Sequence, residues 1–262
     1  MTNTSSAAVE RGSSATETPL LNVHGIEKAY GGVRALHSVD FHVNPGEIVG
    51  LVGPNGSGKS TLLACMSRDI PADAGQIHFA GADITKLRPS AVNRHGLSRT
   101  FQSVRVFPEL TVWENALLGR QWRGVGVLSL LRRADDETVA RVSTLLELVE
   151  ISDLAKEYAG NLSGGQLRLL ELVMAMASKP RLVLLDEATS GVNPTLIEAL
   201  KRYVQLLHAE EGVSFLLVEH NIGFIFSIAH RIVVLQDGQV LADGTPTEIR
   251  ENSEVIDAYL GA

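Results

Sequence analysis

One glycine-rich stretch of the chain has the residue types and spacing of a phosphate-binding loop. It matches the pattern GxxxxGK[ST] at every fixed position and consists of Gly53, Pro54, Asn55, Gly56, Ser57, Gly58, Lys59, Ser60 and Thr61. Glycines allow successive backbone N–H groups to point at phosphate oxygens, and the N-terminus of a following helix adds partial positive charge. The stretch therefore predicts a nucleoside triphosphate site, in which Lys59 reaches the β- and γ-phosphates and the Ser60 hydroxyl binds Mg²⁺.

The residues on either side of this loop provide the context that it needs. Residues 47–52 form a short apolar run typical of a buried strand, and a helix is expected to begin at residues 61–66. A phosphate-binding loop requires strand, loop and helix in this order. The alternative is a glycine-rich turn that binds nothing, and the flanking residues argue against it.

Two adjacent acids follow a second apolar run, at residues 182–185. Asp186 and Glu187 would stand at the C-terminal end of a buried strand, where open α/β sheets bind their ligands. Asp186 is predicted to hold the Mg²⁺, and Glu187 to orient or deprotonate a water in line with the γ-phosphate. Two solvated acids in a loop are the alternative. The phosphate-binding loop favours the first interpretation, because a magnesium site needs a second protein segment.

The order of short strands and helices along the chain predicts an α/β fold. Strands are expected at residues 20–26, 39–43, 47–51, 76–79, 182–185, 215–218 and 232–235, and helices at 112–118, 137–148, 167–177, 194–207 and 221–229. The last three strands are continuous apolar runs that alternate with helices, which is typical of a parallel sheet. The first strands predict a partly antiparallel sheet around the loop, and residues 104–161 predict a helical insertion.

Composition limits the possible partners of the chain. The formal net charge of the 262 residues is -7, and no dense run of Lys and Arg is present, which argues against a nucleic-acid partner. The single cysteine, Cys65, excludes an internal disulfide and is expected to be a small apolar filler. No apolar run approaches the roughly 18 to 20 residues that span a bilayer. Residues 1–18 are rich in Ser, Thr and Ala and are expected to be a disordered tail.

A third motif, Leu162-Ser163-Gly164-Gly165-Gln166, lies just before the acidic strand. With it, the chain resembles the ATP-binding cassette (ABC) ATPases over about residues 20–262. The resemblance implies a P-loop core of mainly parallel sheet at residues 19–102 and 162–262, an antiparallel β subdomain, and a helical subdomain at 103–161. It also implies ATP and Mg²⁺ as ligands, and a second ABC ATPase subunit whose nucleotide is contacted by Ser163, Gly164, Gly165 and Gln166.

The resemblance assigns roles to three more residues. Tyr30 resembles the aromatic residue that stacks on adenine, with a core tyrosine as the alternative. Gln102 resembles the glutamine that contacts Mg²⁺ and the attacking water. His220 resembles the family's switch histidine, which can bridge the γ-phosphate and the base. The chain departs from the family pattern at Ala188, where Pro is usual, and at Asn193, where Asp is usual.

Several further stretches resemble the ATPase subunits of branched-chain amino acid importers, namely residues 99–107, 110–115 and 255–261. This resemblance implies membrane permease subunits as partners, a solute-binding protein as an indirect partner, and a location at the cytoplasmic face of the membrane. Val106, Phe107 and Leu110 would dock the permease, or would pack within the helical insertion instead. ATPases for urea, amides or lipopolysaccharide, and soluble cassettes without a transport role, are the alternatives.

Overall fold

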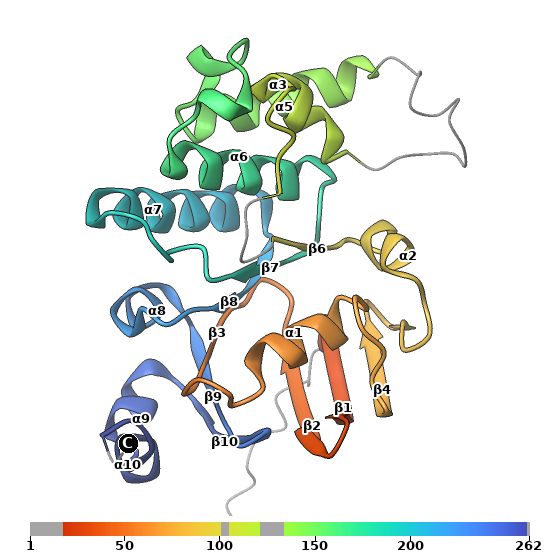
Figure 1. Cartoon of the computed structure of the whole chain (residues 1–262), viewed down its shortest axis with the longest axis vertical. Coiled ribbons are helices and arrows are strands. Elements are labelled where there is room, and N and C mark those ends of the chain that lie inside the picture. The colour runs from red at the N-terminus through yellow and green to blue at the C-terminus, as the bar shows by residue number, and fades with distance from the viewer. Residues whose placement is uncertain (1–17, 101–104, 121–133, 261–262) are drawn as a thin grey trace, which may run out of the picture.

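The computed structural model describes residues 18–100, 105–120 and 134–260 (Figure 1). The tail predicted at residues 1–18 lies outside these ranges except for its last residue, and Gln102 and Val104 lie outside them as well. The division of residues 19–262 into a core and a helical subdomain with boundaries at 102/103 and 161/162 stays a prediction.

The six-stranded sheet that carries the predicted phosphate loop and acids has the order β10-β9-β3-β8-β7-β6. Its strands are β3 (Ile48–Val52), β6 (Leu97–Arg99), β7 (Leu182–Asp186), β8 (Ser214–Val218), β9 (Arg231–Gln236) and β10 (Gln239–Gly244). The strands from β9 to β6 pair in parallel, and β10 pairs with β9 in the antiparallel direction. β3, β7 and β8 are buried along their whole length. Burial on both faces of the sheet accounts for their largely apolar sequences.

The register of this sheet aligns the ends of its central strands. Val218 of β8 lies beside Leu51 of β3 on one side and beside Asp186 of β7 on the other. Parallel strands present their carboxyl ends at the same edge of a sheet. The loops that follow β3, β7 and β8 therefore begin next to one another.

A four-stranded sheet with order β2-β1-β4-β5 packs against the first sheet through helix α1 (Lys59–Met66). Its strands are β1 (Leu21–Tyr30), β2 (Val33–Val43), β4 (Ala74–Phe79) and β5 (Ala82–Asp83), and every pairing is antiparallel. Apolar side chains of α1 belong to a core cluster that includes residues of both sheets. Cys65 is part of that cluster, and burial raises the pKa of its thiol to about 11, so it acts as an apolar filler as predicted.

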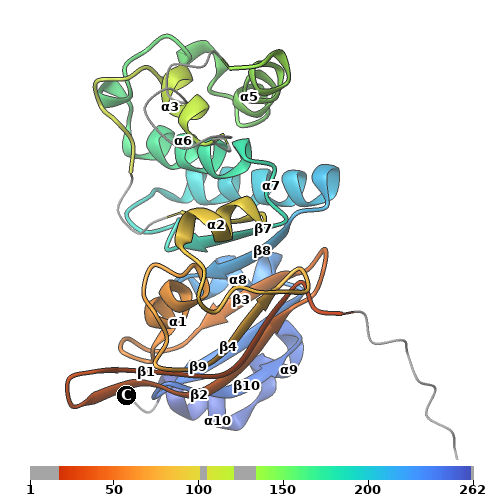
Figure 2. The same cartoon turned by 90° about the vertical axis from the view of Figure 1, so that its right-hand side faces the viewer.

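Helices α3 (Val112–Leu118), α5 (Asp136–Leu148) and α6 (Gly164–Ala177) lie together at one end of the molecule, above α7 (Pro194–Glu211) and strands β7 and β8 (Figure 2). α3 and α5 both contact α6. The Thr111 side chain caps α3, and the Asp135 side chain caps α5. The predicted helix at 112–118 is confirmed to the residue, and the one at 137–148 begins one residue earlier.

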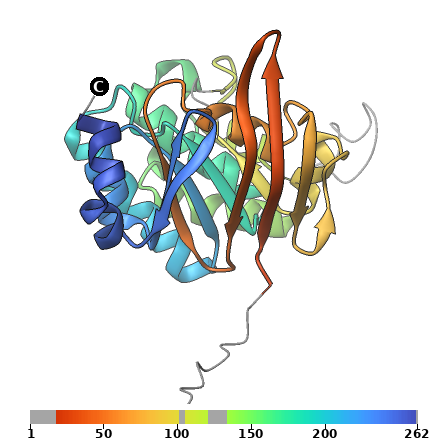
Figure 3. The same ribbon diagram turned by 90° about the horizontal axis from the view of Figure 1, so that it is seen from below.

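Several short elements were not predicted from the sequence. They are α2 (Pro89–Arg94), β5, β6, β10, α9 (Pro246–Glu251), α10 (Ser253–Leu260) and two 3₁₀ turns at Ser152–Leu154 and Ala159–Asn161. β6 has only three residues and owes its identity to pairing with β7, which a local pattern does not show. α9 and α10 lie at the β10 edge of the molecule, on the opposite side from β4 (Figure 3).

Two predicted helices have different bounds in the structure. α8 (Ile222–Ile228) is shorter than predicted, and α7 extends to Glu211, where Gly212 ends it in a left-handed conformation.

The described helices are too short or too polar to cross a bilayer. Within residues 18–100, 105–120 and 134–260, none combines the length and the apolar character that a bilayer crossing requires.

The strand that carries Asp186 provides a test of the core. Leu184 in the middle of β7 is completely buried, so the Leu184→Ala substitution leaves a cavity. We expect it to lower the free energy of unfolding by about 2–5 kcal/mol. Val33→Ala is the control, because Val33 is 71% exposed and its loss should cost no more than about 0.5 kcal/mol. Urea denaturation followed by circular dichroism measures both; equal midpoints for the two variants would contradict the assignment of β7 to the core.

Candidate functional site

The predicted phosphate-binding stretch begins at Gly53, directly after β3, and ends at Thr61, in the first turn of α1. Gly53 and Gly58 have φ angles of 156° and 99°. A Cβ atom at Gly53 would lie 2.1 Å from the Leu235 carbonyl oxygen, and one at Gly58 would lie 2.6 Å from the Ala35 carbonyl oxygen. Both positions therefore require glycine. A Cβ at Gly56 would meet open space, but the φ of 81° at this position favours glycine as well. α1 begins at Lys59, two residues before the predicted start, because the Gly58 carbonyl already accepts a hydrogen bond from Leu62 N–H.

Lys59 lies beneath this loop. Its side chain is buried, and Nζ donates hydrogen bonds to the carbonyl oxygens of Gly53 at 2.9 Å and Pro54 at 3.0 Å. Burial lowers the pKa of Lys59, and the carboxylates of Glu187 and Asp186 act in the opposite direction. Lys59, Asp186 and Glu187 therefore lie close enough to influence one another's charge. The Lys59 ammonium group is held against the carbonyl oxygens of the loop.

Asp186 ends β7 and is only 4% exposed. Its Oδ2 accepts a hydrogen bond from Arg99 at 2.8 Å, and its backbone N–H donates to Thr100 Oγ1 at 3.3 Å. Arg99 also pairs with Asp69 at 2.7 Å, so it bridges the acid of β7 and the segment after α1. No role was predicted for Arg99. Arg99 is the last residue of β6, which pairs in parallel with β7, but the sequence analysis did not predict β6.

Glu187 and His220 lie at the ends of neighbouring strands, and their side chains meet. Glu187 Oε1 and His220 Nε2 are 2.9 Å apart. Glu187 has a φ of 50°, which a residue with a long side chain adopts only under constraint. Its backbone N–H donates to the Val218 carbonyl at 2.8 Å, which holds it against β8. The sequence placed both residues after buried strands, and the parallel register brings them into contact.

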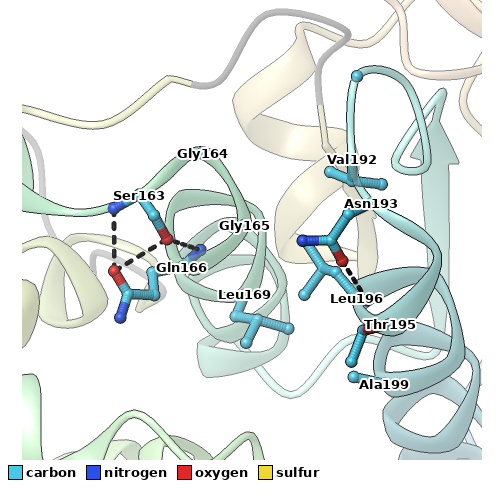
Figure 4. Close-up of a pocket in the computed structure, with 11 residues that line it drawn as sticks. Ser163, Gly164, Gly165, Gln166, Leu169, Val192, Asn193, Thr195, Leu196 and Ala199 are labelled. Atoms are coloured by element: carbon cyan, nitrogen blue, oxygen red, sulfur yellow. Dashed lines mark hydrogen bonds between the residues drawn. The ribbon is translucent and has the colours of Figure 1, made fainter.

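The motif Leu162–Gln166 leads into α6, and its residues Ser163 to Gln166 line a pocket of about 510 Å³. Figure 4 shows Ser163 to Gln166 on one side of it and Val192 to Ala199, from the start of α7, on the other. Ser163 Oγ accepts from Gln166 N–H at 3.3 Å, and Ser163 N–H donates to Gln166 Oε1 at 2.9 Å, which forms a capping box. Asn193 caps α7 by accepting from Leu196 N–H at 2.9 Å. The pocket is therefore walled by the N-terminal turns of two helices.

The other predicted site residues fall into three groups. Tyr30 is 51% exposed at the end of β1, which excludes the core tyrosine and leaves its ring open to a ligand. Phe107 is 55% exposed, whereas Val106 packs against the core of the helical region. Gln102 lies outside the described residues.

The oxygen donors of the site suit a hard cation. Within the described part of the chain, no cluster of three or more His, Cys, Asp or Glu side chains could hold a metal ion. Magnesium needs few protein ligands, since it keeps water and binds phosphate oxygens. A hydroxyl from Ser60 and a carboxylate from Asp186 fit this requirement, and the arrangement as a whole can bind a triphosphate and direct a water at it.

Comparison with known proteins agrees with this geometry. The family described as ABC transporter matches residues 36–190, and the one described as branched-chain amino acid ATP-binding cassette transporter matches residues 239–262. The chain is 37% identical over 250 residues to BraF, a high-affinity branched-chain amino acid transport ATP-binding protein of Pseudomonas aeruginosa, covering 93% of this chain and 98% of BraF.

The chain belongs to the ABC transporter family. It is an ATP-hydrolysing cassette of that family, as the motif Leu162–Gln166 predicted. Among solved structures, the ADP conformation of MJ1267, an ATP-binding cassette of an ABC transporter, superposes with a TM-score of 0.83 at 33% identity, over 94% of this chain and all of that one. A dimeric post-hydrolysis state of the cassette MJ0796 bound to ADP and Pi matches with a TM-score of 0.75 at 25% identity, over 86% of this chain and 98% of that one. The predicted fold class is confirmed.

The buried position of Lys59 makes it the first residue of the cassette to test. Lys59→Ala removes the ammonium group, and we expect ATP affinity to fall by roughly 10- to 100-fold, the usual loss for hydrogen bonds to a charged partner. Lys156→Ala, which removes an exposed lysine, is the control and should bind ATP like the parent. Isothermal titration calorimetry with ATP and Mg²⁺ measures both; unchanged affinity in the Lys59 variant would show that the ammonium group does not contact phosphate.

Proposed function

We propose that this cassette energises an importer of branched-chain amino acids by hydrolysing ATP. The observation that carries the proposal is the agreement over nearly the whole chain with BraF, including the C-terminal segment 239–262 that matches the branched-chain amino acid family. That segment forms α9, α10 and β10 at the edge of the molecule, outside the nucleotide motifs. The proposed substrate class thus rests on the similarity to BraF together with a segment that lies outside the nucleotide motifs.

In the mechanism that we propose, each group of the site has one task. The backbone N–H groups of the loop and Lys59 would bind the phosphates. Ser60 and Asp186 would hold Mg²⁺, which would supply positive charge to neutralise the phosphate oxygens. Gln102 would complete this site. Glu187 would accept a proton from the attacking water or orient it. His220, hydrogen-bonded to Glu187, would hold the carboxylate in place and bridge it to the γ-phosphate. Tyr30 stacks on the adenine.

A second cassette completes the site. In Figures 1 and 2, the helix α6 that begins with the Ser163 motif lies beyond α7 and β7 from α1, which begins with Lys59. One chain therefore presents its two nucleotide motifs on separate parts of its structure. We infer that Ser163, Gly164, Gly165 and Gln166 act on the nucleotide bound by the partner, as the dimeric MJ0796 structure supports. Binding energy then acts by favouring the closed pair.

The permease is the partner that this motion would drive. Phe107 offers an exposed aromatic ring, and Leu110 a half-buried side chain, next to the helical region. We propose that they contact the transmembrane subunits at the cytoplasmic face of the membrane, with the solute-binding protein reached through those subunits.

Glu187→Gln tests the proposed base. The amide keeps the size of the side chain but cannot accept a proton, so we expect ATP binding to persist, turnover to drop by at least about 100-fold, the usual contribution of a positioned base, and an ATP-loaded dimer to accumulate. Phosphate release and size-exclusion chromatography measure these effects, and Glu198→Gln in α7 is the matched control. Parent-like turnover in the Glu187 variant would reassign the base.

Reconstitution tests the transport role. The cassette is purified with its permease subunits, inserted in liposomes and supplied with the binding protein, and ATP hydrolysis is measured with leucine, isoleucine or valine and with urea as the control. We expect the branched-chain amino acids to stimulate hydrolysis and to be taken up. Stimulation by urea alone would move the cassette to another importer class.

A further inference from the structure

A buried acid next to the switch histidine makes two hydrogen bonds that the mechanism above does not use. Glu219 is 3% exposed and follows β8 directly. Its Oε1 accepts from Thr189 N–H at 2.9 Å, and its Oε2 accepts from Thr189 Oγ1 at 2.5 Å. Both oxygens of one carboxylate therefore bind one residue of the loop that follows β7.

Two adjacent residues that follow β8, Glu219 and His220, contact the loop that follows β7. His220 contacts Glu187, and Glu219 contacts Thr189. The two contacts therefore hold the loop at two positions, one at Glu187 and one at Thr189. The loop is thus fixed on both sides of Ala188, which is itself buried.

These contacts on both sides of Ala188 constrain Glu187, whose backbone is strained. The positive φ of Glu187 is a conformation that persists only where the surroundings over-determine it. The N-terminal side of Glu187 is fixed by β7 and by its own hydrogen bond to Val218. The C-terminal side is fixed by Glu219 through Thr189. Burial raises the pKa of Glu219, and the two Thr189 donors oppose that shift, so the carboxylate depends on Thr189 for its hydrogen bonds.

We propose that Glu219 is a positioning residue for ATP hydrolysis: through Thr189 it holds the backbone at Glu187 in the conformation that aims the Glu187 carboxylate at His220. Glu219 contacts neither nucleotide motif in the described hydrogen bonds, so it acts through the loop and not on the reacting atoms. The inference rests on the proposed role of Glu187 as the residue that handles the attacking water.

The hydrogen bonds between Glu219 and Thr189 also fix the loop shortly before it lines the pocket beside α6. The loop continues from Thr189 to Gly191, Val192 and Asn193, which line that pocket opposite Ser163. Fixing Thr189 therefore sets the starting point of the segment that lines the pocket opposite Ser163. A loosened loop should disturb hydrolysis and leave the phosphate-binding loop of the same chain intact.

Thr189→Val tests the proposal with little change in volume. Valine removes the hydroxyl donor to Glu219 and keeps the backbone donor. We expect kcat to fall roughly 10- to 100-fold, the usual cost of losing a supporting hydrogen bond next to a reactive group, while KM and ATP affinity stay at parent values. Thr144→Val is the matched control, because Thr144 bonds only the Ala140 carbonyl of its own helix among the described contacts.

Two variants of Glu219 separate geometry from charge. In Glu219→Gln, the amide oxygen can accept from Thr189 N–H and the NH₂ group can donate to Thr189 Oγ1, since a hydroxyl both donates and accepts. We expect this variant to keep kcat close to the parent value and Glu219→Ala to lose it to the same extent as Thr189→Val. If Glu219→Ala does not fold, the Thr189 and Gln variants decide. A folded Thr189→Val with parent kcat, or a Gln variant as slow as the alanine variant, would overturn the proposal.

The Glu187→Gln variant distinguishes a wrong assignment of the base from a wrong role for Glu219. If it turns over at the parent rate, the proposed base is wrong, and the positioning role falls with it. If it is inactive while Thr189→Val is fully active, the base stands and only the role of Glu219 is refuted.

Discussion

The parallel register of β3, β8 and β7 is the constraint on which the rest of the site depends. Val218 lies beside both Leu51 and Asp186, so the three strands end side by side. Backbone hydrogen bonds make this alignment, and a shift by one residue would turn every side chain to the opposite face of the sheet. The loop that begins at Gly53, the acids Asp186 and Glu187, and His220 all lie at or just after these ends. Their proximity is a consequence of pairing, not of contacts among themselves.

Burial of charge gives the site its chemical character. Lys59, Asp186, Glu187 and Glu219 are all less than 10% exposed. A buried charge is costly unless it is paired or hydrogen-bonded. Each of these groups has such a partner, in loop carbonyls, Arg99, His220 and Thr189 respectively. The partners compensate the cost of desolvation, and they also fix the direction of each side chain before a nucleotide binds. Pre-organisation of this kind is what electrostatic catalysis requires.

Segments with a strong local signal were predicted well, whereas the long strands β1 and β2 were predicted only in part, at residues 20–26 and 39–43. The helix at 112–118 carries its own cap at Thr111, and the strand Leu182–Asp186 is a continuous apolar run. β6 and β10 were missed because β6 is short and both are defined by the strand beside them. The start of α1 was placed two residues late, because it depends on the left-handed conformation of Gly58, which a pattern of apolar residues does not report.

The amino-acid sequence by itself determined the chemistry of this protein. GxxxxGK[ST], the acid pair and LSGGQ predicted an ATP-hydrolysing cassette, since each motif depends on residue types at short spacing. Tertiary structure alone decided which side chains meet. Arg99 reaches Asp186 across 87 residues, and Glu219 reaches Thr189 across 30. Such contacts arise from strand pairing between distant segments, and no local pattern of residues encodes them.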